Sequence, residues 1–361
     1  MQVAHAFPPY VGGLSHVVAN VSRQLVRLGH EVEVVTLDPS GKLPEREEVE
    51  GVFVRRFRGF APWNAYFVPS RRAYGYLRSV EADVVHAHNV GAVLVPACGL
   101  ALRGRRGRLG FVLSPHHHAA GSMWHTRMFW WPYGPVAGSV VRSADKVHCV
   151  SEYEAQLVRK DFNVEPVVVP NGVSEDVFRY RWSPPSGGLV LTYAGRLERF
   201  KRVDRLIEAA STLRSRGHSV IVRVIGEGPD LGRLTGVAVR RGVSVEHHPF
   251  LVRGEYLDLV SRSSCFVNLS RFEAYSIVTA EAVAMGVPAV VALPWGRTFE
   301  GYSKTVSVNG ESVDEVAEAV EKTAFMNVDG AGAVPGWSEV VDRLVQEVYA
   351  PTLSAPVEGI S

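Results

Sequence analysis

Cysteine is scarce in this sequence, and long apolar segments are absent. The 361 residues include three cysteines, Cys98, Cys149 and Cys265, each in or beside an apolar run. An odd number of apolar-flanked thiols does not suit a disulfide framework, so we expect buried free cysteines and a reducing, cytoplasmic environment. No apolar run approaches the roughly 18 residues of a membrane-spanning helix, and no charged, cleavable leader is visible. We therefore expect neither a signal peptide nor a membrane span.

A large net charge of either sign is also lacking. The 39 lysines and arginines nearly balance the 37 acidic residues, which leaves a formal charge of +2. This balance argues against a dedicated nucleic-acid-binding protein, although local basic patches stay compatible with it. The content of hydrophobic residues, 46%, is ordinary for a globular protein, and the length suffices for two domains with separate cores.

A strand, a turn and a short helix in the second half of the chain carry two unusual glutamates. Cys265–Leu269 is a short apolar run, and small residues predict a helix over Ser276–Met285 before a second buried strand. In such a βαβ unit, the end of the first strand and the start of the helix form a crevice that favours phosphate. Glu273 lies in the turn, where sugar hydroxyls could donate hydrogen bonds to it, and Glu281 lies within the helix. Each glutamate alone could equally be a solvated or locally paired acid.

Two other strand ends in the same half suit a diphosphate. After the expected strand Leu189–Ala194, the sequence Gly-Arg-Leu-Glu-Arg-Phe-Lys contains Arg196 and Lys201 as fixed cations. After Val220–Ile225 comes Gly-Glu-Gly-Pro, which begins with Gly226. Arginine binds phosphate through its planar fork, and lysine binds it as a point charge. A basic turn taken alone, however, is typical of a solvated surface.

The first half opens with a strand, a glycine pair and a helix. Gln2–Phe7 predicts the strand, Gly12 and Gly13 lie in the loop, and apolar residues from Leu14 to Leu28 recur at helical spacing. A glycine pair at this place lets the backbone approach a phosphate closely. Turns use glycine for its backbone freedom about as often, so the pair alone is a weak signal.

Histidines follow two further strands of the first half. Asp83–His88 ends in two histidines, and Leu109–Pro115 leads into His116, His117 and His118. Such a group suggests a metal ion, yet no Cys, Asp or Glu accompanies the histidines at ligand spacing. The chain also lacks an Asp-x-Asp sequence, a carboxylate arrangement that suits Mg²⁺ on a diphosphate. We therefore expect no metal site.

Two segments are rich in aromatic residues. Phe53–Arg78 interleaves aromatic residues with arginines and lacks clean periodicity, and Trp124–Tyr133 concentrates aromatic residues after the second group of histidines. Such segments can contact an anionic membrane surface or an acceptor with a lipid-phosphate tail. The alternatives are a partly buried loop that its arginines solvate and the end of a core helix.

Taken together, these motifs resemble glycosyltransferase family 4, a family of retaining enzymes with the GT-B fold. The resemblance rests on the opening G-G-L-S-H-V-V, the G-R-L and G-E-G-P turns, and two glutamates with seven residues between them, followed by A-V-A-M-G-V-P. It implies an α/β fold of two Rossmann-like domains that face a central cleft. Residues 1–180 would be the acceptor-side domain and residues 188–330 the nucleotide-sugar-binding domain, joined by the linker Trp182–Gly188. Residues 331–361 would form a terminal helix that crosses back to the first domain.

The resemblance also implies roles for single residues. In the family, the first glutamate holds hydroxyls of the donor sugar and the second usually holds the ribose, which gives Glu273 and Glu281. Arg196 and Lys201 correspond to the cations that stabilise the leaving diphosphate. The family commonly has Gly-Phe-Gly after the first glutamate, where this chain has Ala-Tyr-Ser, so the identity of the sugar stays open. The other implied donor-binding positions are Gly12, Gly13, Gly226, Leu251, Tyr275, Ser276 and Ile277.

An acceptor-side histidine completes the implied site. In the family it follows a strand in a Ser/Thr-x-His setting, which Ser114, Pro115 and His116 match. We take His116 as the first choice and His118 as the reserve.

The implied function is transfer of a hexose from a UDP- or GDP-sugar to a hydroxyl acceptor, either a glycan or a lipid-linked molecule. Configuration would be retained, and neither a metal ion nor another cofactor is expected. A sugar-nucleotide epimerase of the same fold and a non-catalytic nucleotide-sugar-binding module are the alternatives, and a histidine metal hydrolase is the least favoured. The aromatic segments add the hypothesis of peripheral contact with anionic lipid at the inner face of the cell membrane.

Overall fold

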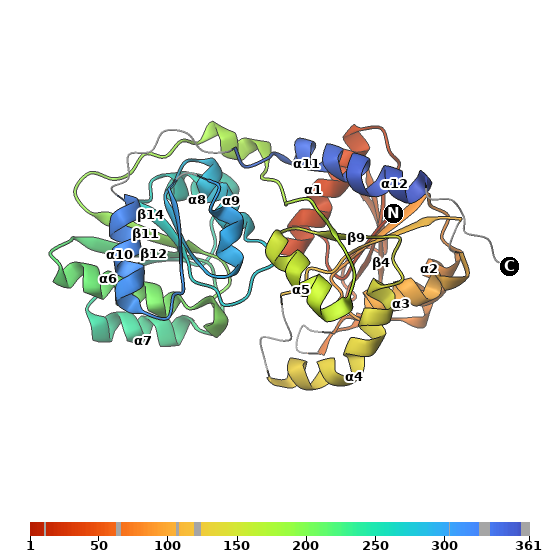
Figure 1. The fold of residues 1–361 in the computed structure, drawn as a ribbon, viewed down its shortest axis with the longest axis horizontal. Helices are drawn as coiled ribbons and strands as arrows, with labels where there is room; N and C mark the ends of the chain where they lie inside the picture. Colours follow the sequence, from red (N-terminus) through yellow and green to blue (C-terminus); the bar gives the residue numbers. More distant parts are fainter. Residues whose placement is uncertain are drawn as a thin grey trace. The chain divides into compact units, whose positions relative to one another are not determined.

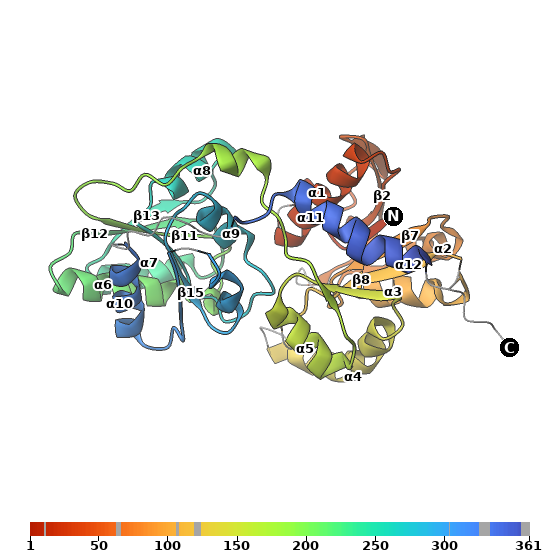
Figure 2. The ribbon, with the colours of Figure 1, turned by 45° about the horizontal axis from the view of Figure 1, so that its top comes forward.

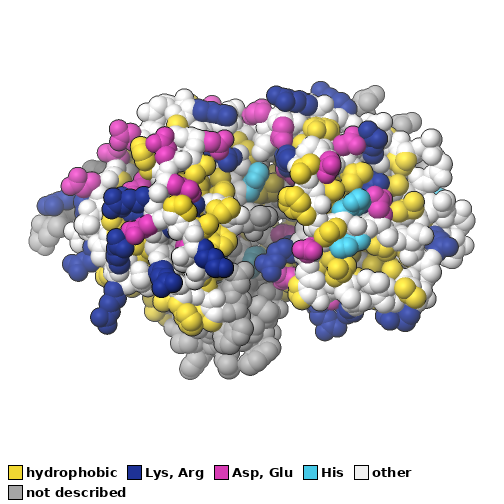
Figure 3. All heavy atoms as spheres, turned by 180° about the vertical axis from the view of Figure 1, so that it is seen from behind, with side chains coloured by type: hydrophobic (Ala, Val, Ile, Leu, Met, Phe, Trp, Pro, Cys, Tyr) yellow, Lys and Arg dark blue, Asp and Glu magenta, His cyan; other side chains and the backbone are white. Residues whose placement is uncertain are grey.

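The chain folds into two compact units, which Figure 1 shows in ribbon form. Unit 1 comprises residues 1–171 and 337–361, and unit 2 comprises residues 172–336. The computed structural model describes residues 1–10, 12–62, 66–105, 108–118, 124–302, 304–324 and 333–354. The side chains of residues 124–132 and 354 are excepted. Positive and negative side chains are interspersed on the described face in Figure 3, in keeping with the small net charge.

Unit 1 is built on an eight-stranded sheet in the order β10-β9-β8-β7-β1-β2-β4-β3. All pairs are parallel except that of β3 with β4. The inner strands β1 and β8 are buried at every position, because helices cover both faces of such a sheet. The strands are β1 (Gln2–Ala4), β2 (Glu33–Leu37), β3 (Arg46–Val49), β4 (Val52–Phe57), β7 (Val84–His88), β8 (Gly110–Ser114), β9 (Lys146–Cys149) and β10 (Val167–Val168), with β5 (Gly59–Phe60) and β6 (Val68–Pro69) paired separately.

The helices of unit 1 come from both ends of the chain. The C-terminal segment packs on the N-terminal helix α1, and Figure 2 shows it in blue beside the red α1. Trp337, at the start of this segment, is buried. The helices are α1 (Gly13–Arg27), α2 (Arg71–Ser79), α3 (Leu94–Ala101), η2 (Arg103–Arg105), α4 (Trp124–Val141), α5 (Glu152–Phe162), α11 (Trp337–Arg343), the π-helical η6 (Leu344–Tyr349) and α12 (Ala350–Ser354).

Unit 2 is built on a six-stranded parallel sheet in the order β13-β12-β11-β14-β15-β16. Its strands are β11 (Leu189–Ala194), β12 (Val220–Ile225), β13 (Ser244–His248), β14 (Cys265–Asn268), β15 (Ala289–Ala292) and β16 (Thr305–Val308). Its helices are η3 (Glu175–Arg179), η4 (Arg199–Lys201), α6 (Val203–Ser215), α7 (Leu231–Arg241), α8 (Arg253–Ser261), α9 (Ile277–Ala284), η5 (Trp295–Phe299) and α10 (Val313–Ala324).

The division between the units differs from the sequence-based expectation. The sequence predicts a linker at Trp182–Gly188, whereas unit 2 begins at Gly172. The reason is that this segment bonds to unit 2: the Trp182 backbone N–H donates to the Met285 carbonyl at 2.8 Å, and its indole N–H donates to the Ser263 carbonyl at 2.9 Å. At the other end, unit 1 resumes at Trp337.

Two further expectations concern thiols and membrane spans. Cys98, Cys149 and Cys265 are buried and free, which confirms that expectation. Among the described helices, none is both long enough and apolar enough to cross a bilayer.

Candidate functional site

The strand order of each sheet reverses at one point, and the candidate residues gather there. In unit 2, the chain adds β12 and β13 on one side of β11, and then β14, β15 and β16 on the other. Ligands of open parallel sheets bind at the carboxyl ends of the strands beside such a reversal. The loops after β11 and β14 carry Arg196, Lys201 and Glu273, so the strand order brings these loops to one edge.

Lys201 and Glu273 form an ion pair in unit 2. The Lys201 ammonium lies 2.5 Å from Oε1 of Glu273, and the two side chains are only 18% and 16% exposed. Their loops are also joined by the backbone, because the Arg271 N–H donates to the Phe200 carbonyl at 2.9 Å. The structure therefore brings together the predicted phosphate-binding cation and the predicted sugar-binding carboxylate.

Arg196 is placed differently from Lys201. Its side chain is 69% exposed and pairs with Glu198 at 2.7 Å. An exposed pair of this kind contributes little to stability. Within unit 2, the second predicted cation thus lies in solvent and is not part of the Lys201–Glu273 pair.

Gly226 has a packing reason to be glycine. The Gly195 N–H donates to the Ile225 carbonyl at 2.9 Å, and the Leu197 N–H donates to the Glu227 carbonyl at 2.8 Å. A Cβ on Gly226, whose φ is +129°, would overlap the Gly195 carbonyl. Glycine here lets the turns after β11 and β12 pack backbone against backbone, which accounts for the Gly-Glu-Gly sequence without a ligand.

Glu281 is buried in α9 with two partners on α8. Its Oε1 accepts from the Arg253 guanidinium at 2.6 Å, and its Oε2 accepts from the Tyr256 hydroxyl at 2.8 Å. Burial raises the pKa of Glu281, and Arg253 acts in the opposite direction. Arg253 also binds Asp176 at 3.0 Å. Each carboxylate oxygen keeps a second lone pair, and the side chain is only 3% exposed.

The remaining predicted positions of unit 2 lie at the start of α9 and after β13. Ser276 is the N-cap of α9, and its hydroxyl also accepts from the Asn268 amide at 3.0 Å. The Tyr275 ring packs against Phe299 with centroids 5.4 Å apart, and its buried hydroxyl has no partner among the described residues. Ile277 and Leu251 are half-buried.

In unit 1, β8, β7 and β1 are adjacent strands of the sheet, and the predicted residues lie in the loops that follow them. Gly12 is the N-cap of α1 and Gly13 is its first residue, and both are exposed. A Cβ on either would meet no atom within 4 Å. Packing therefore does not explain this glycine pair, whereas it does explain Gly226.

The three consecutive histidines point to different neighbours. His116 is half-buried, and its Nε2 lies 3.3 Å from Nδ1 of His88, with the two rings stacked. Burial and nearby histidines lower the pKa of His116 to about 3. His117 instead binds Asp161 at 2.7 Å through its own Nε2, and His118 is exposed. Of the three, His116 is the one that hydrogen-bonds to His88.

Several residues beside the predicted site residues of unit 1 and unit 2 were not predicted from the sequence. In unit 1, His5 follows β1 and its Nδ1 lies 3.3 Å from the amide of Asn89, which follows β7. In unit 2, Arg253 and Tyr256 are the partners of Glu281. A usable signal for His5 and Asn89 was their position, because polar residues just after parallel strands lie at the ligand-binding edge.

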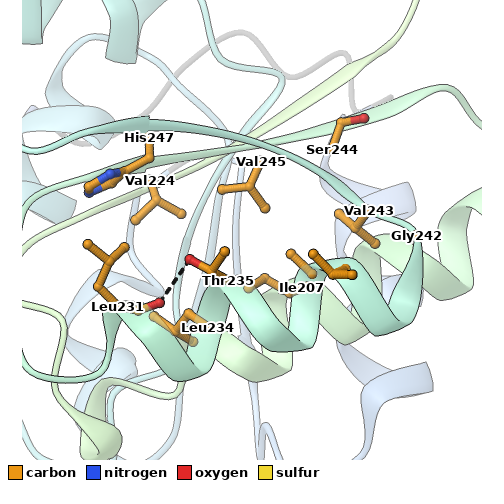
Figure 4. A pocket seen from close by; sticks show the side chains of 12 residues that line it. Ile207, Val224, Leu231, Leu234, Thr235, Gly242, Val243, Ser244, Val245 and His247 are labelled. Atoms are coloured by element: carbon orange, nitrogen blue, oxygen red, sulfur yellow. Dashed lines mark hydrogen bonds between the residues drawn. The ribbon is translucent and has the colours of Figure 1, made fainter.

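Two further features bear on ligand binding, namely metal-ligating side chains and a hollow in unit 2. Within the described ranges, no group of three or more His, Cys, Asp or Glu side chains could hold a metal ion. A hollow of about 430 Å³ lies between α7 and β13 (Figure 4), and apolar side chains such as Leu234 and Val245 line it. None of the predicted site residues lines this hollow, and its one histidine, His247, is bound to the Gly226 carbonyl at 2.9 Å.

Much of the basic and aromatic segment Phe53–Arg78 is structural. Arg56 is buried, pairs with Glu47 at 2.6 Å and donates to the Pro8 carbonyl at 2.7 Å. The Tyr76 hydroxyl donates to Glu33 at 2.8 Å. Among the described residues of the segment, the exposed aromatic side chains are Phe53, Phe60 and Tyr74, and the side chains of Val68, Arg58, Arg71, Arg72 and Arg78 are exposed as well. In the second segment, the side chains of 124–132 lie outside the described residues, while Tyr133 is buried.

Two family models match the chain. The model described as Glycosyltransferase Family 4 matches residues 11–177, and the model described as Glycosyl transferases group 1 matches residues 175–322. The chain is 28% identical to D-inositol 3-phosphate glycosyltransferase 1 of Catenulispora acidiphila, over 92% of this chain and 90% of the relative. It is 26% identical to the GDP-mannose:cellobiosyl-diphosphopolyprenol alpha-mannosyltransferase of Xanthomonas campestris, over 97% of each chain.

Solved structures resemble the whole chain at lower identity. Sucrose-phosphate synthase from Thermosynechococcus elongatus aligns with a TM-score of 0.72 and 15% identity, over 98% of this chain and 96% of that one. Anabaena HepE, solved with UDP and glucose, aligns with a TM-score of 0.69 and 14% identity, over 98% and 99% of the two chains. At these identities the likeness shows a common fold.

Proposed function

The chain belongs to glycosyltransferase family 4 and has the GT-B fold, and from this premise we propose that it transfers a hexose from a UDP- or GDP-sugar to a hydroxyl acceptor. The transfer retains the anomeric configuration and uses no metal ion. Unit 2 binds the donor. Unit 1 contributes His116 and the glycine pair at the start of α1.

The observation that carries this proposal is the ion pair of Lys201 and Glu273. A nucleotide sugar brings a dianionic diphosphate next to a neutral ring of hydroxyls. Lys201 and Glu273 supply one group for each, 2.5 Å apart, beside the strand reversal of unit 2. Because the two side chains are largely shielded from water, their interactions with the donor are stronger than those of exposed charges.

The chemistry follows from these two groups. When the bond between the anomeric carbon and the diphosphate oxygen breaks, negative charge develops on the leaving phosphate, where Lys201 stabilises it. Glu273 accepts hydrogen bonds from sugar hydroxyls and so fixes the ring for attack. The acceptor oxygen bonds to the anomeric carbon on the face from which the diphosphate leaves, and its proton passes to the leaving phosphate oxygen.

The acceptor is either a lipid-linked molecule or a glycan. The Xanthomonas campestris relative is named for a diphosphopolyprenol, and the chain is similar to it over nearly its full length. Phe53 and Phe60 are exposed on unit 1, and exposed aromatic side chains suit a bilayer interface. We therefore include peripheral contact with anionic lipid at the inner face of the cell membrane in the proposal.

The test is incubation with a panel of nucleotide sugars, followed by assay of free nucleoside diphosphate with and without hydroxyl acceptors. Slow release without an acceptor, accelerated by a particular acceptor, is the expected result and identifies both substrates. The Lys201→Ala variant is the control, because its release should fall with every donor. Tight binding of nucleotide sugars with no release under any condition would contradict catalysis and favour a binding module.

A further inference from the structure

A continuous row of hydrogen bonds runs through the interior of unit 1 and ends at His116. It begins at a backbone carbonyl and passes through buried side chains from four neighbouring strands and from the C-terminal segment. In order, its members are the Val169 carbonyl, His148, Ser114, His86, Tyr349, Gln2, His88 and His116.

The carbonyl of Val169 sets the direction of the first bonds, because it can only accept. His148 must donate to it from Nε2, at 2.8 Å. A neutral imidazole has one N–H, so Nδ1 of His148 accepts, and the Ser114 hydroxyl donates to it at 2.7 Å. With its proton used there, the Ser114 oxygen accepts from Nε2–H of His86, also at 2.7 Å. Burial keeps the imidazoles neutral by lowering the pKa of His148 to about 4 and that of His86 well below its usual value.

The same reasoning continues through the C-terminal segment. Nδ1 of His86 accepts from the Tyr349 hydroxyl at 2.8 Å. The Tyr349 oxygen is then left as an acceptor, so the Gln2 side chain turns its NH₂ toward it, at 3.5 Å. This orientation points the Gln2 amide oxygen at His88, where it accepts from Nε2–H at 2.7 Å. The direction is thus fixed by chemistry and not by the choice of amide orientation.

The last bond of the row determines the proton of His116. Because Nε2 of His88 carries its hydrogen, Nδ1 of His88 is an acceptor, and it lies 3.3 Å from Nε2 of His116. The hydrogen of His116 therefore resides on Nε2, and the lone pair resides on Nδ1. No described residue hydrogen-bonds to that Nδ1. The backbone also restrains the ring, since the N–H of the next residue, His117, donates to the buried Glu154 at 2.7 Å.

We infer that Gln2, His86, His88, Ser114, His148 and Tyr349 are positioning residues that hold His116 as a neutral acceptor, with Nδ1 presented to a substrate hydroxyl. This inference rests on the proposed role of His116 in transfer. The inferred tautomer decides what that role is. The lone pair on Nδ1 accepts a hydrogen bond from a hydroxyl, whereas it would repel the negative charge that develops on a leaving diphosphate. It also gives the C-terminal segment a function, since Tyr349 supplies the proton that keeps the row directed.

The experiment is NMR of protein carrying ¹⁵N-labelled histidine, in which the two ring nitrogens report the tautomer of each imidazole. The His116→Ala variant identifies the resonances of His116. We expect the wild-type protein at pH 7 to show His116 as the single neutral tautomer with hydrogen on Nε2. Hydrogen on Nδ1, or a protonated ring, would overturn the inference, and the tautomer itself is measured on the wild-type protein.

Two variants then test the row itself. Tyr349→Phe removes the proton donated to His86 and the acceptor used by Gln2, so His116 should become a mixture of tautomers. Turnover should fall about three- to tenfold, the usual effect of one hydrogen bond, with little change in the KM for the donor. The matched control is Tyr76→Phe, which also removes a tyrosine hydroxyl bond in unit 1, a partly buried one to Glu33, and should leave His116 unchanged. An unchanged tautomer in Tyr349→Phe would overturn the positioning role.

The failure of this inference is distinguishable from that of the proposed function. If His116→Ala keeps full activity while the wild-type tautomer is as inferred, the row exists and the role of His116 in transfer is wrong. If His116→Ala is inactive but the tautomer has hydrogen on Nδ1, transfer involves His116 and the positioning inference is wrong.

Discussion

At the scale of single residues, Glu273 is the side chain on which the proposed donor site depends most. Replacement by glutamine keeps its shape and removes its charge, so hydrogen bonds from sugar hydroxyls become weaker. We expect Glu273→Gln to lower kcat by orders of magnitude. Affinity for the nucleoside diphosphate alone should stay equal or increase, because Lys201 loses its partner at 2.5 Å. Steady-state kinetics and titration calorimetry measure the two effects, and an unchanged kcat would remove Glu273 from the site.

The two predicted cations allow a test of metal independence. Lys201→Ala should lower kcat by about 10²–10³, as loss of one group that stabilises developing charge typically does. Arg196→Ala should cost less, since that side chain is 69% exposed and already pairs with Glu198. The double variant should be worse than either, and EDTA should leave wild-type activity intact. Loss of activity in EDTA that Mg²⁺, Mn²⁺ or Zn²⁺ restores would refute the cation mechanism.

Glu281 differs from Glu273 in that its two oxygens already have partners. If a ribose adds hydrogen bonds to this carboxylate, Glu281→Ala should weaken nucleoside diphosphate binding by about 1.5–3 kcal/mol. Tyr256→Phe is the control, because it removes one internal partner, at 2.8 Å, and keeps the carboxylate. Calorimetry on both variants separates the cases. Equal losses of nucleoside diphosphate affinity in the two variants would mean that Glu281 acts by holding α8 and does not contact the nucleotide.

At the scale of secondary-structure elements, Glu154 near the start of α5 joins three segments. Its carboxylate oxygens accept hydrogen bonds from the N–H of Val150 after β9 and the N–H of His117 after β8. The backbone N–H of Glu154 donates to the Ser151 hydroxyl. Burial raises the pKa of Glu154 to about 7. The folded state therefore favours the protonated carboxyl. Its stabilising contribution is complete below the unfolded pKa, near 4.5, and is lost as the pH rises through 7.

The raised pKa of Glu154 makes the stability of the protein depend measurably on pH. Glu154→Gln cannot titrate, so the difference in unfolding free energy between wild type and variant isolates the carboxyl. Between pH 5 and pH 8 the wild type should lose roughly 2 to 3 kcal/mol relative to the variant. Urea unfolding at the two pH values measures it. A difference that stays constant with pH would show that Glu154 titrates normally.

The elements also show why some of the fold could be predicted and some could not. Small residues predict a helix over Ser276–Met285. The helix α9 spans Ile277–Ala284, with Ser276 as its N-cap and Met285 as its C-cap. Phe53–Arg78 had no readable period because it contains most of β4, the short antiparallel pair of β5 and β6, and most of α2, and strands and helices differ in period. The arginines there suggested a solvated surface, but Arg56 is buried against Glu47 and a carbonyl, which a local pattern does not reveal.

At the scale of the whole molecule, residues far apart in the sequence explain what the sequence could not predict about the site. Residue types at strand ends marked Lys201, Glu273 and His116 as candidates, and the resemblance to the family selected them. Their partners were not visible, because Gln2 meets Tyr349 across 347 positions of sequence. Pairing over such a distance depends on the strand order and on the return of the C-terminal segment to unit 1, and neither leaves a periodic signal.

The proposed contact with lipid is also a property of the whole molecule. With a net charge of +2 and both signs interspersed on the face that Figure 3 shows, long-range attraction to an anionic bilayer is small. Contact must then rest on a local patch, for which the exposed Phe53 and Phe60 are the apolar candidates. We expect weak cosedimentation with vesicles containing anionic lipid at low salt. The bound fraction should fall as salt screens charges beyond about 10 Å at 0.1 M.

Phe60→Ser provides the matched variant for that measurement. This side chain is 68% exposed, so its loss should reduce vesicle binding without affecting the fold or the release of nucleoside diphosphate from a soluble donor. Neutral vesicles are the second control, since they retain the apolar contribution and remove the electrostatic one. Absence of cosedimentation with anionic vesicles at low salt would contradict membrane contact. The acceptor would then be a soluble glycan or another soluble hydroxyl compound, reached without a bilayer.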